Sequence, residues 1–254
     1  MRVCVISSGS KGNCSLIQTK NHNILIDIGN SCKYVENTLK NLDILPENID
    51  MIFITHAHID HVAGLRVFSK KYRPKVYTTE KIYKETNIVL DNVHFINGDI
   101  DFEDIQVGII KTSHDTADSN GYIVYEDKES CVYITDTGYI HERYFKKLYN
   151  KTIYVFESNH DPEMLMNNPR YPHHTKIRIL SDRGHLSNQD SAYYLSRFIG
   201  PDTKQVILAH LSEQNNEEHL ALNTLRQTLD SNDIEFDSIV CARQNIPTEV
   251  YQYD

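Results

Sequence analysis

The chain of 254 residues has only five cysteines and no long apolar run. The cysteines are odd in number, widely scattered and free of C-x-x-C spacing, which argues against a disulfide framework and a cysteine-based zinc site. The N-terminus turns polar at Ser7, too early for a signal peptide, and no stretch approaches the length of a membrane span. We therefore expect a soluble, cytoplasmic protein with free thiols, folded as a single domain over residues 1–254.

Basic residues are also scarce, because 26 Lys and Arg stand against 35 Asp and Glu and give a formal net charge of -9. A polyanionic partner must therefore be met by a local basic patch or by bound metal, and not by the average field of the protein. Histidine, in contrast, is abundant, with 13 residues. Since imidazole binds metals and carries protons near neutral pH, the histidines are the first place to look for a functional site.

Short β-branched or apolar runs recur along the chain and predict buried strands. They cover residues 3–6, 24–28, 51–54, 107–111, 131–134, 153–156 and 206–208. Segments of helical length and pattern cover residues 34–42, 62–71, 187–199 and 217–229. Ser187, followed by Asp190, is a capping-box-like start for the third of these. The pattern predicts a layered α/β architecture, in which the least regular stretch is the proline-bearing segment 161–174.

Six of the predicted strands are followed directly by a histidine or a carboxylate. Ligands from separate segments must converge in space to make a site, and strands that deliver them at the same end build a shared edge of the sheet. The sequence therefore predicts an active-site edge. The first such residues after each run are Asp27, His56, His114, Asp136, Glu157 and His210.

The strongest signal is the hexapeptide His56-Ala57-His58-Ile59-Asp60-His61. In an extended segment, residues two apart share a side, so His56 and His58 can bind one metal ion. Asp60 and His61 then lie where the chain turns into the next helix and can point at a second ion. The alternative, a group of surface histidines in a polar turn, is disfavoured by this spacing.

In their order along the chain, these motifs resemble the metallo-beta-lactamase superfamily, whose marks are an early Asp, H-x-H-x-D-H, a later His, an Asp and a last His. The resemblance covers nearly the whole chain and implies a four-layer αββα sandwich, an α/β fold, with two divalent metal ions. One ion would be held by three histidines, the other by a second trio, with one carboxylate between the two ions. These residues are His56, His58 and His114 for the first ion, Asp60, His61 and His210 for the second, and Asp136 as the bridge.

The superfamily role of Asp27 would be to orient the ligand loop through hydrogen bonds, with an ordinary turn cap as the alternative. Imidazole and carboxylate ligands suit Zn, Mn or Fe without choosing among them. A redox di-iron member would carry Glu in place of His58, and a beta-lactamase would need an export signal. The ligand set fits hydrolysis, in which a hydroxide held between two ions attacks a phosphodiester or a thioester.

Four local features favour a phosphodiester, and seven side chains within them are candidates for substrate contacts. The first two lie in a small-residue turn whose backbone N–H groups can approach an anion, although a plain hairpin turn is an equal alternative. The next three crowd the end of one strand. The two arginines belong to a basic and aromatic stretch suited to a single strand of nucleic acid, with a solvated face as the alternative. They are Ser10, Asn13, Glu157, Asn159, His160, Arg178 and Arg183.

Three further motifs narrow the resemblance to the YycJ or WalJ branch of the superfamily. They are residues 157–161 (Glu-Ser-Asn-His-Asp), 184–188 (Gly-His-Leu-Ser-Asn) and 210–212 (His-Leu-Ser). The resemblance implies a nucleic-acid phosphodiesterase, with 5′-to-3′ DNA exonuclease activity expected. It also implies two catalytic residues, His185 to protonate the leaving oxygen or stabilise developing charge, and Asp60 to orient the hydroxide.

The expected partner is nucleic acid, with single-stranded or 5′-ended DNA favoured and no membrane, and a homodimer is compatible with the sequence. One alternative is a phosphodiesterase for a small cyclic nucleotide or a phosphoribosyl compound, and a less favoured one is a thioester hydrolase. A metal-stabilised binding protein without turnover is a third. Residues 66–104 match no motif, so the sequence does not exclude a different substrate that is recognised by this stretch.

Overall fold

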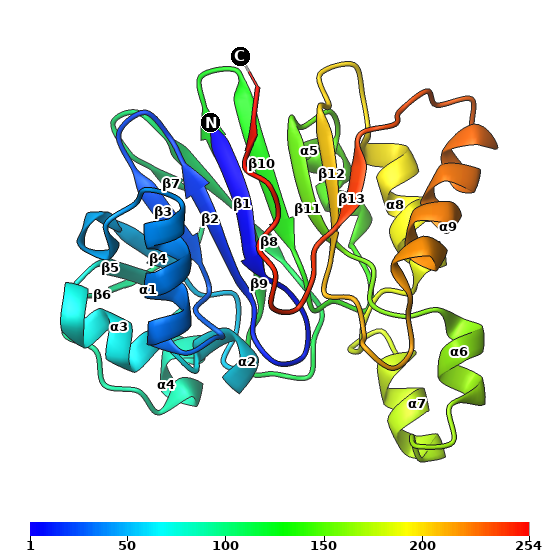
Figure 1. Cartoon of the computed structure of the whole chain (residues 1–254), viewed down its shortest axis with the longest axis horizontal. Coiled ribbons are helices and arrows are strands. Elements are labelled where there is room, and N and C mark those ends of the chain that lie inside the picture. Colours follow the sequence, from blue (N-terminus) through cyan, green and yellow to red (C-terminus); the bar gives the residue numbers. More distant parts are fainter. Residues whose placement is uncertain (254) are drawn as a thin grey trace.

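The computed structural model describes residues 1–253, and within this range the strands form two seven-stranded sheets. The two sheets face each other, and helices cover both outer faces (Figure 1). The expected αββα sandwich is confirmed. The first sheet contains, in spatial order, β14 (Tyr251–Gln252), β1 (Arg2–Ser7), β2 (Cys14–Gln18), β3 (Asn23–Ile26), β4 (Met51–Phe53), β5 (Lys75–Thr78) and β6 (Val93–Phe95). The second contains β13 (Ile239–Cys241), β12 (Gln205–Ala209), β11 (Ile153–Glu157), β10 (Glu129–Ile134), β9 (Asn120–Glu126), β8 (Gln106–Lys111) and β7 (Ile100–Asp101).

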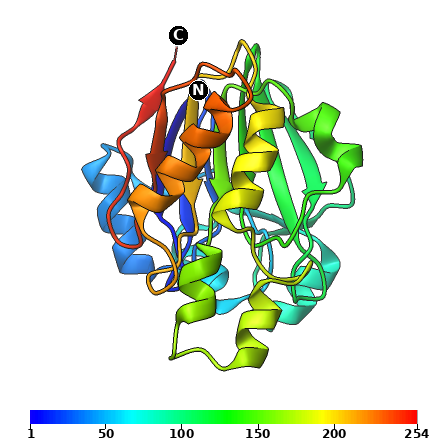
Figure 2. The same cartoon turned by 90° about the vertical axis from the view of Figure 1, so that its right-hand side faces the viewer.

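Helices flank the two sheets on opposite sides of the molecule (Figures 1 and 2). Those beside the first sheet are α1 (Cys32–Asn41), α2 (Ile59–Val62), α3 (Leu65–Tyr72) and α4 (Glu80–Thr86), with the short 3-10 turn η1 (Pro46–Asn48). Those beside the second are α5 (Phe145–Leu148), α8 (Asn188–Phe198) and α9 (Glu218–Asp230), with η2 (Glu142–Tyr144). The pair α6 (Pro162–Asn167) and α7 (His173–Ile179) projects beyond the sandwich as a small lobe (Figure 1).

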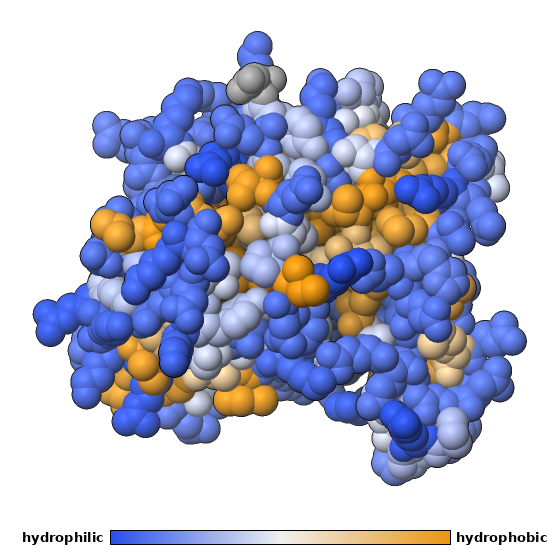
Figure 3. All heavy atoms as spheres, in the orientation of Figure 1, coloured by the Kyte–Doolittle hydropathy of each residue, from blue (hydrophilic) through white to orange (hydrophobic). Residues whose placement is uncertain are grey.

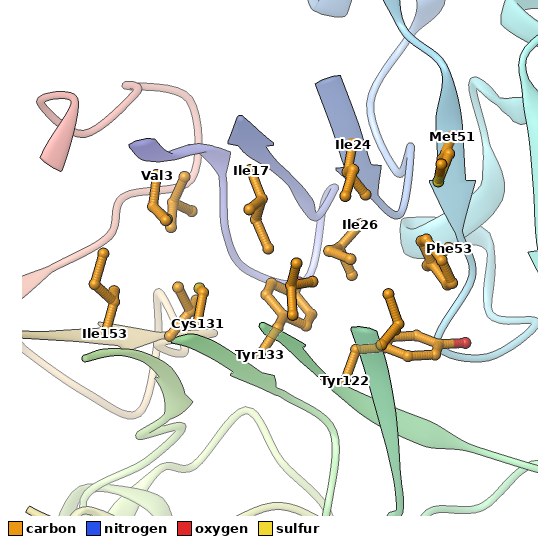
Figure 4. Close-up of a cluster of buried hydrophobic side chains, with 14 of the residues drawn as sticks. Val3, Ile17, Ile24, Ile26, Met51, Phe53, Tyr122, Cys131, Tyr133 and Ile153 are labelled. Atoms are coloured by element: carbon orange, nitrogen blue, oxygen red, sulfur yellow. The ribbon is translucent and has the colours of Figure 1, made fainter. Parts of the chain in front are cut away.

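Strand alternation divides the apolar side chains into a central core and two outer cores. Along β1, Val3 and Val5 join the cluster between the sheets, whereas Cys4 and Ile6 pack toward the helices. Figure 4 shows the central cluster, in which side chains of the first sheet meet those of the second. Phe53 is a fully buried member of this cluster and stacks on Tyr77 at 4.8 Å between ring centroids.

Strand direction gathers the ends of both sheets at one edge. In the second sheet β10, β11 and β12 are parallel, and β8 runs the same way because β9 is antiparallel to both of its neighbours. In the first sheet β3, β4 and β5 are parallel. The backbone N–H of Asn120 donates to the carbonyl oxygen of Thr55 at 2.9 Å and ties the sheets together at this edge.

The predicted strands and the capping box of Ser187 with Asp190 are confirmed, but one strand, one helix and one irregular stretch differ from expectation. The strand expected over residues 24–28 stops at Ile26, because Asp27 turns to a φ of 60°. The helix expected over 62–71 is broken before Leu65, where Gly64 packs too closely on the Asn30 carbonyl to carry a Cβ. The segment 161–174 contains α6 and the start of α7. Within residues 1–253 no helix has the length and hydrophobicity needed to cross a membrane.

Phe53→Ala is expected to lower the free energy of unfolding by about 3–5 kcal/mol, because it leaves a cavity between the sheets. Phe95, which is 53% exposed on β6, is the matched control, and Phe95→Ala should change stability by less than about 1 kcal/mol. Urea unfolding followed by circular dichroism measures both. Equal losses in the two variants would contradict the assignment of the central core.

Candidate metal centre

The histidine-rich hexapeptide leaves the end of β4 as an extended segment and then enters α2 at Ile59. His56 and His58 lie in the extended part, and Asp60 and His61 lie in the first turn of the helix. His56 is 1% exposed and His61 is fully buried, whereas Asp60 remains partly accessible. The change from extended chain to helix therefore points the four side chains in two directions from one short loop.

The structure brings His56, His58 and His114 together, with ligand atoms of all three within 4.8 Å of one another. His58 Nδ1 and His114 Nε2 are 3.3 Å apart. Metal–nitrogen bonds of 2.0–2.1 Å in a tetrahedral site place neighbouring ligand atoms about 3.4 Å apart. The spacing of these histidines therefore fits a single metal ion.

A second trio, Asp60, His61 and His210, also has its ligand atoms within 4.8 Å. Asp136 lies between the two trios, with Oδ2 3.2 Å from His61 Nε2 and Oδ1 3.8 Å from His114 Nε2. Its carboxylate can therefore reach both places where an ion fits. The two trios are those that the resemblance to the superfamily implies, and the bridging role of Asp136 stays a prediction.

Several buried polar atoms at this edge have no hydrogen-bond partner among residues 1–253. They are His56 Nε2, His210 Nε2 and Asp136 Oδ2. A buried polar group without a partner costs about 1–3 kcal/mol, so the arrangement is unfavourable unless something else satisfies these atoms. Imidazole nitrogens and carboxylate oxygens are ligands for transition-metal ions, so the donor set fits divalent metal.

Asp27 holds the ligand loop through hydrogen bonds to Thr55 and His61. Its Oδ2 lies 2.7 Å from His61 Nδ1, and it accepts hydrogen bonds from the backbone N–H and the hydroxyl of Thr55 at 2.8 and 2.7 Å. The carboxylate therefore fixes the orientation of the His61 ring and leaves Nε2 to face Asp60 and Asp136. Asp27, Asp136 and His210 all have φ near 60°, a left-handed conformation that costs energy outside glycine.

Glu157 is fully buried and binds two histidines through Oε1, His185 Nδ1 at 2.8 Å and His210 Nδ1 at 3.1 Å. Its other oxygen accepts the backbone N–H of Thr137 at 2.9 Å. Burial raises the pKa of Glu157, but the two histidines outweigh it and lower that pKa to about 2. Burial likewise lowers the pKa of His210, but the charges of Asp136 and its other carboxylate neighbours raise it to about 10. His185 is thus held by an ionised carboxylate at Nδ1, with Nε2 on the opposite side of the ring.

Residues 8–210 match the family model of the metallo-beta-lactamase superfamily. The chain belongs to the metallo-beta-lactamase superfamily. It is 37% identical to the exodeoxyribonuclease YycJ of Bacillus anthracis over 89% of this chain and 88% of that protein. It is 35% identical to the exodeoxyribonuclease WalJ of Streptococcus pneumoniae over 91% of this chain and 88% of that protein. The fold is also similar to that of YhfI from Bacillus subtilis, with a TM-score of 0.70, 14% identity and coverage of 98% and 99%.

Two side chains predicted to contact substrate, Asn13 and Asn159, also touch residues of the candidate ligand set. Asn13 Nδ2 lies 3.0 Å from His61 Nε2 and 3.4 Å from Asp60 Oδ2. Asn159 donates to the backbone carbonyl of His210 at 2.8 Å. Both amides therefore brace residues of the second trio. A role for them in substrate binding stays a prediction.

The two predicted arginines reach the loop that carries His114. Arg178 pairs with Asp115 at 2.6 Å, and Arg183 donates to the backbone carbonyl of His114 at 3.1 Å. Ser10 is exposed on the turn between β1 and β2. In that turn the N–H of Gly9 donates to Asn13 Oδ1, so this donor is engaged within the turn.

His160 is buried next to α8, where it forms an isolated bridge with Ser187. Both of its ring nitrogens lack a hydrogen-bond partner within residues 1–253. Burial lowers the pKa of His160 to about 4, so the ring is neutral at pH 7. Its contact with a substrate stays a prediction.

Sequence reasoning missed three residues that organise the site. Thr55 bonds Asp27, Asp115 Oδ1 lies 3.3 Å from His114 Nε2, and the N–H of Thr137 holds Glu157. Each stands next to a predicted ligand in the sequence, so adjacency was the available signal. Nothing in the local pattern says which neighbour of a ligand points inward.

Asp27→Asn is expected to weaken metal binding about 10- to 100-fold, because the ionised acceptor for His61 Nδ1 is lost while the backbone conformation is kept. Asp43, which also has a positive φ of 58° but is exposed, provides the matched control Asp43→Asn. Competition with a chromogenic chelator measures the affinity. Unchanged affinity in Asp27→Asn would rule out the orienting role.

Acid should destabilise the metal-free protein partly through His160. Because its pKa in the folded state, about 4, lies below the unfolded value near 6.5, the unfolded chain takes up the proton first as the pH falls. Stability is therefore lost between pH 6.5 and 4. With chelator present, the wild type should lose about 2 kcal/mol more than His160→Gln between pH 6.5 and 4.5. Equal pH slopes in urea titrations of the two proteins would show that the ring does not titrate this way.

Proposed function

We propose that the chain is a metal-dependent exodeoxyribonuclease that degrades DNA in the 5′-to-3′ direction. The observation that carries the proposal is the meeting of two metal-ligand trios, the Asp136 carboxylate and the His185–Glu157 pair at one strand edge. The names of the relatives that are 35–37% identical over about nine-tenths of the chain support DNA as the substrate. The imidazole and carboxylate ligands support two ions of Zn, Mn or Fe.

The chain's own residues would supply proton transfer and orientation. When bound, divalent ions lower the pKa of water and neutralise charge on phosphate oxygens. Asp60, partly accessible at the edge of the second trio, would orient the attacking water as well as bind metal. His185 would donate a proton from Nε2 to the leaving 3′ oxygen, because Nδ1 is engaged by Glu157. The contact with Glu157 fixes the orientation of the His185 ring and leaves Nε2 as the nitrogen available for this step.

The substrate would enter from the side of the α6–α7 lobe, which projects beyond the strand edge (Figure 1). The side chains on this lobe are mainly hydrophilic in the face shown in Figure 3. Arg170 on the lobe is exposed and Lys176 is partly so, whereas the charge of Arg178 is paired with Asp115. A basic lobe beside a metal centre gives an acidic protein the local positive field that a phosphate backbone requires.

The test is a nuclease assay on a 5′-labelled single-stranded oligonucleotide, the matching duplex and bis(p-nitrophenyl) phosphate, each with Mn or Zn. We expect DNA cleavage that chelator abolishes, and a loss of metal and activity in Asp136→Asn. His185→Gln should lower kcat about 10²- to 10⁴-fold while it keeps its metal. His219→Gln, on an exposed histidine of α9, should behave as wild type.

Cleavage of the small diester without any cleavage of DNA would falsify the nuclease assignment and favour a small phosphodiester as substrate. Wild-type activity in Asp136→Asn would contradict the two-ion arrangement. Release of nucleotides from the 3′ end first would overturn the proposed direction.

A further inference from the structure

Beside the metal centre lies a groove of about 380 Å³ lined largely by aromatic side chains. Two tyrosines in it have exposed rings, Tyr139 at 39% and Tyr193 at 47%. The two rings lie in one groove, so together they offer neighbouring aromatic surfaces to a ligand. The groove is lined by Tyr139, Ile140, His141, Glu142, Phe145, Tyr193 and Tyr194.

The groove is joined to the centre by a very short piece of chain. Tyr139 follows Asp136 by three residues, so their Cα atoms lie within about 11 Å of each other. The hydroxyl of Thr137 donates to the carbonyl of Tyr139 at 2.7 Å, and the N–H of Ile140 donates to the Tyr194 hydroxyl at 3.1 Å. The first bond fixes the turn that follows Asp136, and the second ties the segment 137–140 to α8.

The ring of Tyr193 stands on a well-packed support. Its neighbour Tyr194 packs against Phe145 and Phe198 at centroid distances of 5.9 and 6.1 Å, and the two tyrosine rings meet edge-on at 5.3 Å. The Arg197 guanidinium lies 4.6 Å from the centroid of the Tyr193 ring. An exposed ring held in place by neighbours loses little conformational entropy when a ligand stacks on it.

Cations flank the groove without partners of opposite charge. Within residues 1–253, no carboxylate oxygen lies within 4.0 Å of the charged nitrogens of Arg143, Lys146 or Arg197, so these cations remain free to meet a phosphate. Glu142 is the carboxylate that lines the groove. Asp190 on α8 accepts a hydrogen bond from the Ser187 hydroxyl. Exposed aromatic rings with unpaired cations match a single strand of nucleic acid, whose bases stack and whose phosphates are negative.

We propose that this groove binds unpaired bases of a single-stranded DNA substrate, with Tyr139 and Tyr193 as the stacking surfaces. This inference rests on the proposed nuclease function and adds a substrate class to it. The strand would pass from the metal centre along the Tyr139 segment to α8, with its phosphates near Arg143 and Arg197. Stacking tolerates any base, so the groove favours single-stranded ends without selecting a sequence.

The test measures binding and turnover of a 5′-phosphorylated, fluorescein-labelled oligothymidylate. In the slow His185→Gln background, Tyr193→Ala and Tyr139→Ala should each raise the Kd about tenfold by fluorescence anisotropy. In the active enzyme the same changes should raise KM for the oligonucleotide while kcat on bis(p-nitrophenyl) phosphate stays within twofold. Arg197→Gln should lower the slope of log Kd against log salt by about one.

Two controls separate stacking from structure. Tyr193→Phe keeps the ring and should restore binding to within twofold of wild type. Tyr149→Ala removes a tyrosine that is 49% exposed but precedes the start of β11, at the opposite end of that strand from Glu157, and should leave the Kd unchanged.

If both alanine variants bind DNA normally and the wild type cleaves DNA, the proposal that the groove binds DNA is wrong, whereas the nuclease proposal still stands. A parallel fall in kcat on the small diester, or failure of Tyr193→Phe to restore binding, would assign the tyrosines a structural role. If wild-type protein neither binds nor cleaves any DNA but hydrolyses the small diester, both proposals fail.

Discussion

The candidate metal centre depends on the contact between the two sheets at their common strand edge. The hexapeptide comes from the first sheet, whereas His114, Asp136 and His210 come from the second. Neither sheet alone supplies a complete set, because each trio takes members from both. The bond from Asn120 N–H to the Thr55 carbonyl and that from the Tyr122 hydroxyl to the Ile54 carbonyl therefore set the spacing of the site. Phe53 and Tyr122 belong to the core between the sheets, so the packing of this core affects the spacing of the metal ligands.

The site concentrates charge that the fold cannot easily bury without a cation. Glu157 and Asp136 are buried among histidines, and the carboxylates raise the pKa of His210 to about 10. In the absence of metal, protons on the rings would balance these carboxylates, and a divalent ion would displace those protons. Much of the net charge of -9 lies elsewhere, but these few carboxylates turn a negative protein into one with a positive centre once metal binds.

The fold class and the gathering of polar residues at the strand ends could be predicted from local patterns, whereas the division of the ligands into two trios was implied by the resemblance to the superfamily. Apolar runs mark strands, and the H-x-H-x-D-H spacing requires an extended chain that turns into a helix, as found at Ile59. The left-handed backbone at Asp27 was not predictable, since it is imposed by its bonds to Thr55 and His61. Pairings across long separations, such as Arg178 with Asp115, depend on where the α6–α7 lobe folds back.

The same limit applies to the polar residues near the strand ends, whose contacts with the ligand loops could not be predicted from the sequence. A loop at a sheet edge has few backbone hydrogen-bond partners, so side chains must bond its carbonyl oxygens. Asn159 does so for His210 and Arg183 for His114. Such contacts hold the ligand loops in place. A long substrate would also meet surfaces further out, beyond the ligand loops. The α6–α7 lobe and the aromatic groove after Asp136 are two such surfaces, and only the fold places them beside the metal centre.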